Sequence, residues 1–142
     1  MRSVLIFLVT VLLSPALGAA ALIPADDENI LYTGRWDHSN HLEPWAYAKG
    51  TSVIAIFSGT SLSASISATT TDYLRIIIDG DAENSQKIPI AFGTASYPLA
   101  NNLSAGSHKV EIVKEADAGR WTFLGFELDD EAGLESPPDR PA

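Results

Sequence analysis

Between residues 53 and 128 the chain is organised as short segments rich in apolar residues, separated by residues that favour turns. The clearest segment is 61–68, in which serine and apolar residues alternate without interruption. Because successive side chains of a strand point to opposite faces, this alternation predicts a β-strand with one buried and one wet face. Segment 53–57 is apolar at every position, which predicts a strand covered on both faces.

Other segments have the same character. Residues 73–78 are followed by Asp79-Gly80, a pair that tolerates positive φ and therefore predicts a tight turn. Segment 87–92 contains Pro89, which lacks a backbone donor and so predicts an edge position or a bulge. The remaining predicted strands lie at 97–100, 107–114 and 121–128.

Segment 24–130 has no stretch with the 3.6-residue apolar spacing and the caps of an amphipathic helix. Many short strands at a spacing of roughly ten residues predict an all-β fold, an antiparallel sandwich or barrel, in this segment. Residues 131–142 contain Pro137, Pro138 and Pro141 among acidic residues, which predicts an extended Pro-rich linker or tail.

The first twenty residues have a different pattern. Arg2 precedes an apolar run at 4–13, and small residues follow at 18–21. This is the arrangement of a secretory signal peptide. The run is about ten residues long, whereas a membrane-spanning helix needs about twenty, so we favour a signal over a membrane anchor. We therefore predict that residues 1–20 are a signal peptide, that the protein is secreted to the extracellular space, and that no membrane attachment remains after cleavage.

Composition restricts the partners. Lys and Arg number 9 and Asp and Glu number 18, for a net charge of −9, and there is no cysteine. An acidic chain repels phosphate backbones, so we predict no nucleic-acid partner. The lack of cysteine excludes disulfide-framework domains, thiolate nucleophiles and cysteine-based zinc sites.

Histidines and acidic residues do not form a metal motif. His38 and His41 lie among carboxylates, but no HExxH or zinc spacing is present, so we interpret this segment as a polar loop. Segment 79–83 alternates acidic residues but lacks the glycine and glutamate of a calcium loop, so we interpret it as a solvated hairpin tip. His108 shares strand parity with apolar Val110, which favours a core or sheet-end position. We predict no metal and no cofactor.

Aromatic residues are the candidate ligand contacts, since Trp and Tyr stack on sugar rings and hydrogen-bond at their polar tips. Trp45 and Tyr47 lie in a loop next to a proline, where function often gathers. Tyr73 has outward parity in its strand, and Trp121 lies opposite the presumed core residue Leu124. The four form our carbohydrate-binding prediction, and the alternative is that they pack within the sandwich.

One modification signal is present. Asn102-Leu103-Ser104 is an N-glycosylation sequon placed in a turn before a predicted strand. We predict Asn102 as an exposed glycan acceptor, which is used only where a chain passes through a eukaryotic secretory pathway.

Five motifs in order resemble the N-terminal domain of carbohydrate esterase family two. They are Tyr32-Thr33-Gly34-Arg35-Trp36-Asp37 and the segments 59–62, 78–80, 103–110 and 123–129. The resemblance implies a β-sandwich of the jelly-roll type. It also implies a partner: in that family the domain precedes an SGNH hydrolase domain that deacetylates plant polysaccharides, and the Pro-rich tail resembles the connector.

No catalytic residue of the family is carried over to this chain. The family's serine stands in a Gly-Asp-Ser turn of the second domain, whereas Gly80-Asp81 is followed here by Ala82. Segment 59–63 ends in Ser63 rather than the glycine of a nucleophile elbow. We therefore predict that this chain alone is not an enzyme.

Three functions remain at this point. The first is a secreted accessory sandwich of a polysaccharide deacetylase, with plant cell-wall polysaccharide and an SGNH catalytic domain as partners. The second is a free-standing carbohydrate-binding module, and the third is a structural extracellular domain.

Overall fold

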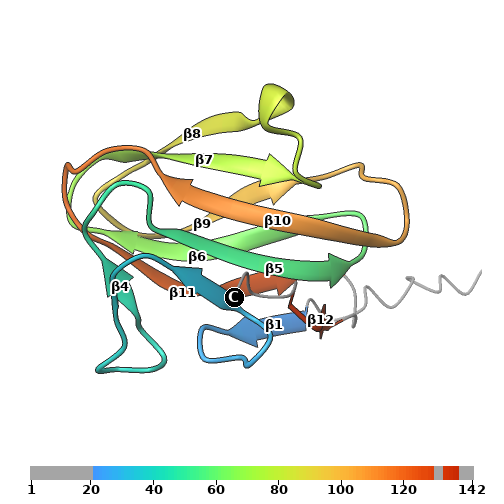
Figure 1. Cartoon of the computed structure of the whole chain (residues 1–142), viewed down its shortest axis with the longest axis horizontal. Coiled ribbons are helices and arrows are strands. Elements are labelled where there is room, and N and C mark those ends of the chain that lie inside the picture. The colour runs from blue at the N-terminus through green and yellow to red at the C-terminus, as the bar shows by residue number, and fades with distance from the viewer. Residues whose placement is uncertain (1–20, 130–132, 138–142) are drawn as a thin grey trace, which may run out of the picture.

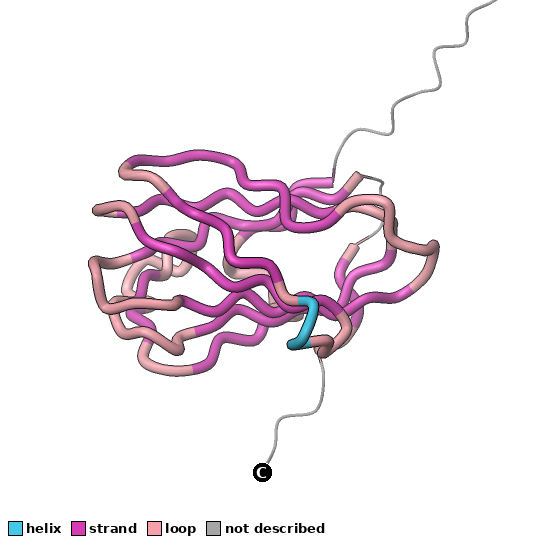
Figure 2. The backbone as a smooth tube through the Cα atoms, turned by 90° about the horizontal axis from the view of Figure 1, so that it is seen from above, coloured by secondary structure: helices cyan, strands magenta, loops and turns pink. Residues whose placement is uncertain are grey.

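A computed structural model of the protein describes residues 21–129 and 133–137, so the predicted signal peptide lies outside the described residues. Two antiparallel sheets pack face to face in a β-sandwich (Figure 1). The predicted all-β fold is confirmed. The helix of the described ranges is a single short turn, η1 (Ala82–Asn84), coloured cyan in Figure 2. No helix in these ranges is long and apolar enough to cross a bilayer.

In the first sheet, sheet A, two short strands lie end to end along the same side of one long strand. Its order is β3 (Trp36–Asp37), β4 (Trp45–Ala46), β11 (Trp121–Leu128), β6 (Leu62–Ala68) and β9 (Gly93–Ala100). β1 (Ala21–Pro24) pairs with the other half of β11.

The second sheet, sheet B, is built the same way. Its order is β12 (Leu134–Glu135), β5 (Ser52–Ser58), β10 (Ser107–Lys114), β7 (Asp72–Ile78) and β8 (Gln86–Ile90), with β2 (Leu31–Thr33) also on β5. β8, which carries Pro89, is an edge strand as the proline predicts. β12 lies inside the predicted linker, and β1 begins before the predicted domain start at residue 24.

The apolar side chains that alternate along the strands fill the space between the two sheets. On β6 the residues Leu62, Ala64, Ile66 and Ala68 are buried and the serines between them are half-buried, as predicted. Burying a large apolar side chain contributes about 1.5–3 kcal/mol. The largest fully buried side chains include Phe57, Leu74, Ile112, Trp121, Phe123 and Phe126.

A β-bulge in β11 changes which residues face the core. The pairing of β11 with β6 shifts register between Phe123 and Gly125, so Trp121 and Phe123 are buried before the shift and Phe126 after it. Gly125 has a φ of 130°, and a Cβ there would lie 2.3 Å from the carbonyl oxygen of Ile23. Only glycine fits this position, because a side chain would push β1 away from β11.

Candidate functional site

A groove lined mainly by β3, β4 and the residues that follow them contains two of the predicted aromatic residues. We call it the aromatic groove; its volume is about 590 Å³. It is lined by Arg35, Trp36, Asp37, Ser39, Trp45, Tyr47 and Ala48.

The residues just before β3 fix the position of Trp36 in the aromatic groove. Gly34 has a φ of 91° and turns the chain between β2 and β3. Trp36 then donates from Nε1 to the carbonyl oxygen of Thr33 at 3.0 Å. Its ring packs 5.0 Å from that of Trp121, measured between centroids. Trp36 is therefore anchored to the core and presents only part of its ring to solvent.

Trp45 and Tyr47 present the more accessible rings. Trp45 is half-buried, and the guanidinium of Arg120 lies 4.6 Å from its ring centroid in a cation–π contact. Tyr47 is 53% exposed, and the Nζ of Lys114 lies 5.7 Å from its ring centroid, so the exposed part of the ring remains able to contact a ligand. Both rings thus have a cation on one side, and Tyr47 is the more exposed of the two.

Asp37 is the carboxylate of the aromatic groove. The hydroxyl and the backbone N–H of Ser39 donate to it, and these hydrogen bonds hold the pKa of Asp37 below its usual range. The charges of His38 and Arg120 act in the same direction. Asp37 is therefore ionised at neutral pH.

The other two predicted carbohydrate contacts lie elsewhere. Tyr73 is 48% exposed on β7 of sheet B, where the Nζ of Lys87 lies 4.7 Å from its ring centroid, and it does not line the aromatic groove. Trp121 is 0% exposed and donates from Nε1 to Thr51 Oγ1 at 3.1 Å. The prediction that Trp121 faces outward is wrong, because the bulge in β11 reverses the parity on which it rested.

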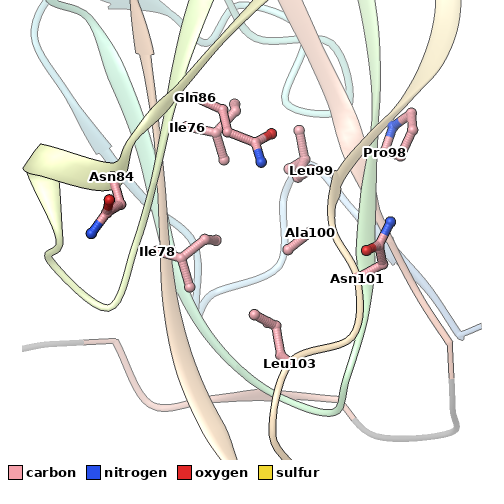
Figure 3. A pocket seen from close by; sticks show the side chains of 9 residues that line it. All are labelled: Ile76, Ile78, Asn84, Gln86, Pro98, Leu99, Ala100, Asn101 and Leu103. Carbon is pink, nitrogen blue, oxygen red and sulfur yellow. The ribbon is translucent and has the colours of Figure 1, made fainter.

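A second cavity, the edge cleft, opens between β7 and β8 on one side and the end of β9 on the other (Figure 3). Its volume is about 280 Å³. Apolar side chains and three amides line it: Ile76, Ile78, Asn84, Gln86, Pro98, Leu99, Ala100, Asn101 and Leu103. Amides donate and accept hydrogen bonds but do not transfer protons near neutral pH, so this cleft offers binding contacts without acid–base chemistry.

The polar segments considered as metal sites are occupied by local contacts. His41 Nδ1 lies 2.9 Å from Asp26 Oδ2, and the ring of His38 packs edge-on against Tyr32. Asp81 caps η1 by accepting a hydrogen bond from the backbone N–H of Asn84. Within residues 21–129 and 133–137 no three His, Asp or Glu side chains are grouped to hold a metal ion.

The glycosylation sequon lies beside the edge cleft. Asn102 is exposed in the loop between β9 and β10, with a φ of 56°. Its Nδ2 lies 3.3 Å from Asn101 Oδ1. The side chain is accessible, and its glycosylation stays a prediction.

His108 links the start of β10 to two loops, as a sheet-end histidine. Its Nδ1 lies 2.7 Å from Asp79 Oδ2 and its Nε2 lies 2.6 Å from the carbonyl oxygen of Ser104. Both partners are acceptors, so the ring satisfies both contacts only when both nitrogens carry protons. The Ser104 carbonyl and then the Asp79 carboxylate raise the pKa of His108, although burial opposes them. Burial would raise the pKa of Asp79, but hydrogen bonds from His108 and from the Lys109 N–H lower it.

These contacts predict a pH dependence of stability. Because the pKa of His108 is raised on folding, its contribution is complete below the unfolded pKa of about 6.5 and is lost as pH rises through the folded value. We expect the melting temperature of the wild type to fall as pH rises above about 6.5. The variant His108→Gln should lack this component and be less stable by about 1–2 kcal/mol at pH 6. Thermal unfolding followed by circular dichroism at several pH values measures both, and an unchanged pH slope in the variant would contradict the assignment.

Comparison with known proteins places these sites in context. The family described as "Carbohydrate esterase 2 N-terminal" matches residues 32–138. Cellulase/esterase CelE of Acetivibrio thermocellus is 30% identical over 105 residues, which are 72% of this chain and 13% of CelE.

Two solved structures show the same sandwich. One is a family two carbohydrate esterase from Clostridium thermocellum in complex with cellohexaose, which is 30% identical and superposes with a TM-score of 0.71. The match covers 78% of this chain and 34% of the esterase chain. The acetyl xylan esterase Est2A of Butyrivibrio proteoclasticus has a TM-score of 0.74 at 15% identity, over 86% of this chain and 35% of its own. The chain therefore spans about a third of the solved relatives and less of CelE.

Proposed function

Since this chain belongs to the carbohydrate esterase 2 N-terminal family, we propose that it is the accessory, non-catalytic sandwich of a secreted polysaccharide deacetylase. The observation that carries this proposal is the extent of the match. The family covers residues 32–138, while the chain spans 13% of CelE and 34% of the esterase solved with cellohexaose. We infer that the esterase chemistry resides in an SGNH-type domain outside the matched region.

The histidine contacts support a non-catalytic role. A serine esterase needs a histidine that hydrogen-bonds the hydroxyl of its nucleophile. His108 uses both ring nitrogens on Asp79 and the Ser104 carbonyl, and His41 contacts Asp26. In the described part of the chain no histidine hydrogen-bonds a serine hydroxyl.

An activity assay tests this part of the proposal. The purified chain is incubated with an acetylated aryl ester, with and without a serine-directed inhibitor. We expect no turnover above buffer. Turnover that the inhibitor abolishes would mean that the chain itself is an esterase.

We propose further that the aromatic groove contacts the polysaccharide. Tyr47 offers an open ring, Trp45 lies beside it, and the groove is bordered by hydrogen-bonding side chains from Asp37 and Ser39. Amphipathic aromatic rings with polar neighbours suit a sugar, which presents C–H faces and hydroxyl edges. This arrangement also supports the alternative of a free-standing carbohydrate-binding module, whereas a structural extracellular domain would not need the groove.

Substitution of Tyr47 tests whether the aromatic groove binds polysaccharide. We expect Tyr47→Ala to weaken retention on soluble xylan or cellulose derivatives in affinity electrophoresis by about tenfold, equivalent to about 1.4 kcal/mol. Phe92→Ala removes a ring that is 77% exposed outside the groove and should leave retention unchanged. A loss in Tyr73→Ala instead would place the binding surface on sheet B. No retention of the wild type would overturn the proposed polysaccharide contact and the binding-module alternative.

A further inference from the structure

The aromatic groove carries positive charge in a protein whose net charge is −9. Arg35 lines the groove, and Arg120 lies over Trp45, close enough to Asp37 to lower its pKa. Asp37 is the single carboxylate among the lining residues. Among the lining residues Arg35 balances Asp37, and Arg120 beside Trp45 adds a net positive charge at the groove.

Among the cations of the described residues, these two guanidinium groups share with Lys49, Lys87 and Lys109 the lack of an acidic partner, and of these five only the two guanidinium groups lie at the aromatic groove. Arg75 contacts Glu115, and Lys114 contacts Asp72. Arg35 and Arg120 are exposed, and among residues 21–129 and 133–137 neither lies within 4.0 Å of a carboxylate oxygen. Their donors are therefore available to a ligand.

We propose that the aromatic groove recognises a carboxylated sugar, a uronic acid unit of a polysaccharide. This deepens the proposed carbohydrate contact and rests on it. A guanidinium presents a planar fork of donors that matches the two oxygens of a carboxylate. The rings of Tyr47 and Trp45 contact the C–H face of the same unit. The cation–π contact with Trp45 restrains Arg120 before binding, so less side-chain freedom is lost when the carboxylate arrives.

The distribution of charge favours a sparsely charged ligand over a polyphosphate. The rest of the protein is acidic and repels a chain with a charge at every unit. At physiological salt the screening length is about 8 Å, so distant acidic groups are weakened while contacts inside the groove persist. The ionised Asp37 in the groove repels the ligand's carboxylate and so weakens its binding.

Binding to matched polymers tests the proposal. The full chain is titrated, by calorimetry at 0.15 M salt, with a uronate-substituted xylan and with the same xylan after its carboxyl groups have been reduced to alcohols. We expect at least tenfold weaker binding to the reduced polymer. Arg35→Gln and Arg120→Gln should each remove most of this preference, and Asp37→Asn should strengthen binding of the uronate form several-fold.

Lys87→Gln is the control for net charge. It removes one positive charge, as the arginine variants do, but Lys87 lies over Tyr73 on sheet B, away from the groove. It should retain the preference. Equal affinity of the wild type for both xylans would overturn the uronate proposal while leaving the carbohydrate role intact. If the wild type binds neither xylan, both the uronate proposal and the proposed carbohydrate contact are overturned. Tighter binding to a sulfated polysaccharide than to the uronate form, or an equal loss in Lys87→Gln, would show ion exchange and overturn carboxylate recognition.

Discussion

Replacing Lys114 by methionine will destabilise the fold by about 3–5 kcal/mol, the range expected when one partner of a buried ion pair is removed. Lys114 and Asp72 are 0% and 3% exposed, and Lys114 Nζ lies 2.8 Å from Asp72 Oδ2. Nζ also donates to the carbonyl oxygen of Ala116. Asp72 Oδ2 accepts no well-aligned hydrogen bond, so the lysine's charge is its main compensation. Without it, a carboxylate stays buried and unpaired between β7 and β10.

A second variant separates charge from packing. Lys114→Met combined with Asp72→Asn removes both charges, and we expect it to recover much of the lost free energy of unfolding. Urea denaturation followed by tryptophan fluorescence measures both variants. If the double variant is as unstable as the single one, the loss comes from packing around the lysine stem and the charge argument fails.

Truncation of Trp121 to alanine should destabilise the protein by a similar amount, about 3–5 kcal/mol. The indole is fully buried, packs against Trp36 and donates to Thr51 Oγ1. Alanine leaves a cavity between the sheets and leaves that hydroxyl without its donor. The cavity term dominates because neighbouring strands are held by their own pairing and collapse only partly.

Trp121→Phe is the matched test. It keeps an aromatic ring and removes the indole N–H, so we expect a smaller loss of about 1–2 kcal/mol. Because the ring of Trp121 does not reach the surface, the phenylalanine variant should retain polysaccharide binding wherever the wild type binds. Chemical denaturation and affinity electrophoresis provide the two readouts. A large loss of binding with little loss of stability would mean that Trp121 reaches the ligand after all.

Local pattern was sufficient for most of the strands. The serine alternation of β6 and the apolar run of β5 predict their strands, and the structure places both within one residue of the predicted ends. The predicted and observed limits of β10 and β11 coincide. These segments are seven or eight residues long, enough for periodicity to be unambiguous.

Features that depend on distant partners were not predictable in this way. β4 and β12 have two residues each, too few for a periodic pattern, and form because β11 and β5 offer unpaired backbone groups. The inward position of Trp121 depends on a bulge at Gly125, where β1 passes close to β11. The glycine at 125 is the signal that a bulge was present, since glycine inside a strand often marks one.

In the candidate site, too, local features were predictable from the sequence and contacts between distant residues were not. Trp45 and Tyr47 were found from residue type and loop position, and the structure brings them into one groove. From the sequence, Arg35 enters only as part of the motif at 32–37, and Arg120 is not singled out. Residue 120 lies far along the chain from residue 45, and only the pairing of β4 with β11 puts its guanidinium over the indole.

The way short strands share a long neighbour also bears on solubility. β2 and β12 divide one side of β5, just as β4 and β1 divide one side of β11. On the opposite margins, β8 contains Pro89 and β9 contains Pro98, each of which lacks an amide hydrogen. In the part of the chain that the structure describes, neither sheet offers a long uninterrupted template for another molecule to extend. We therefore expect this sandwich, which has no disulfide, to resist edge-to-edge stacking at high concentration.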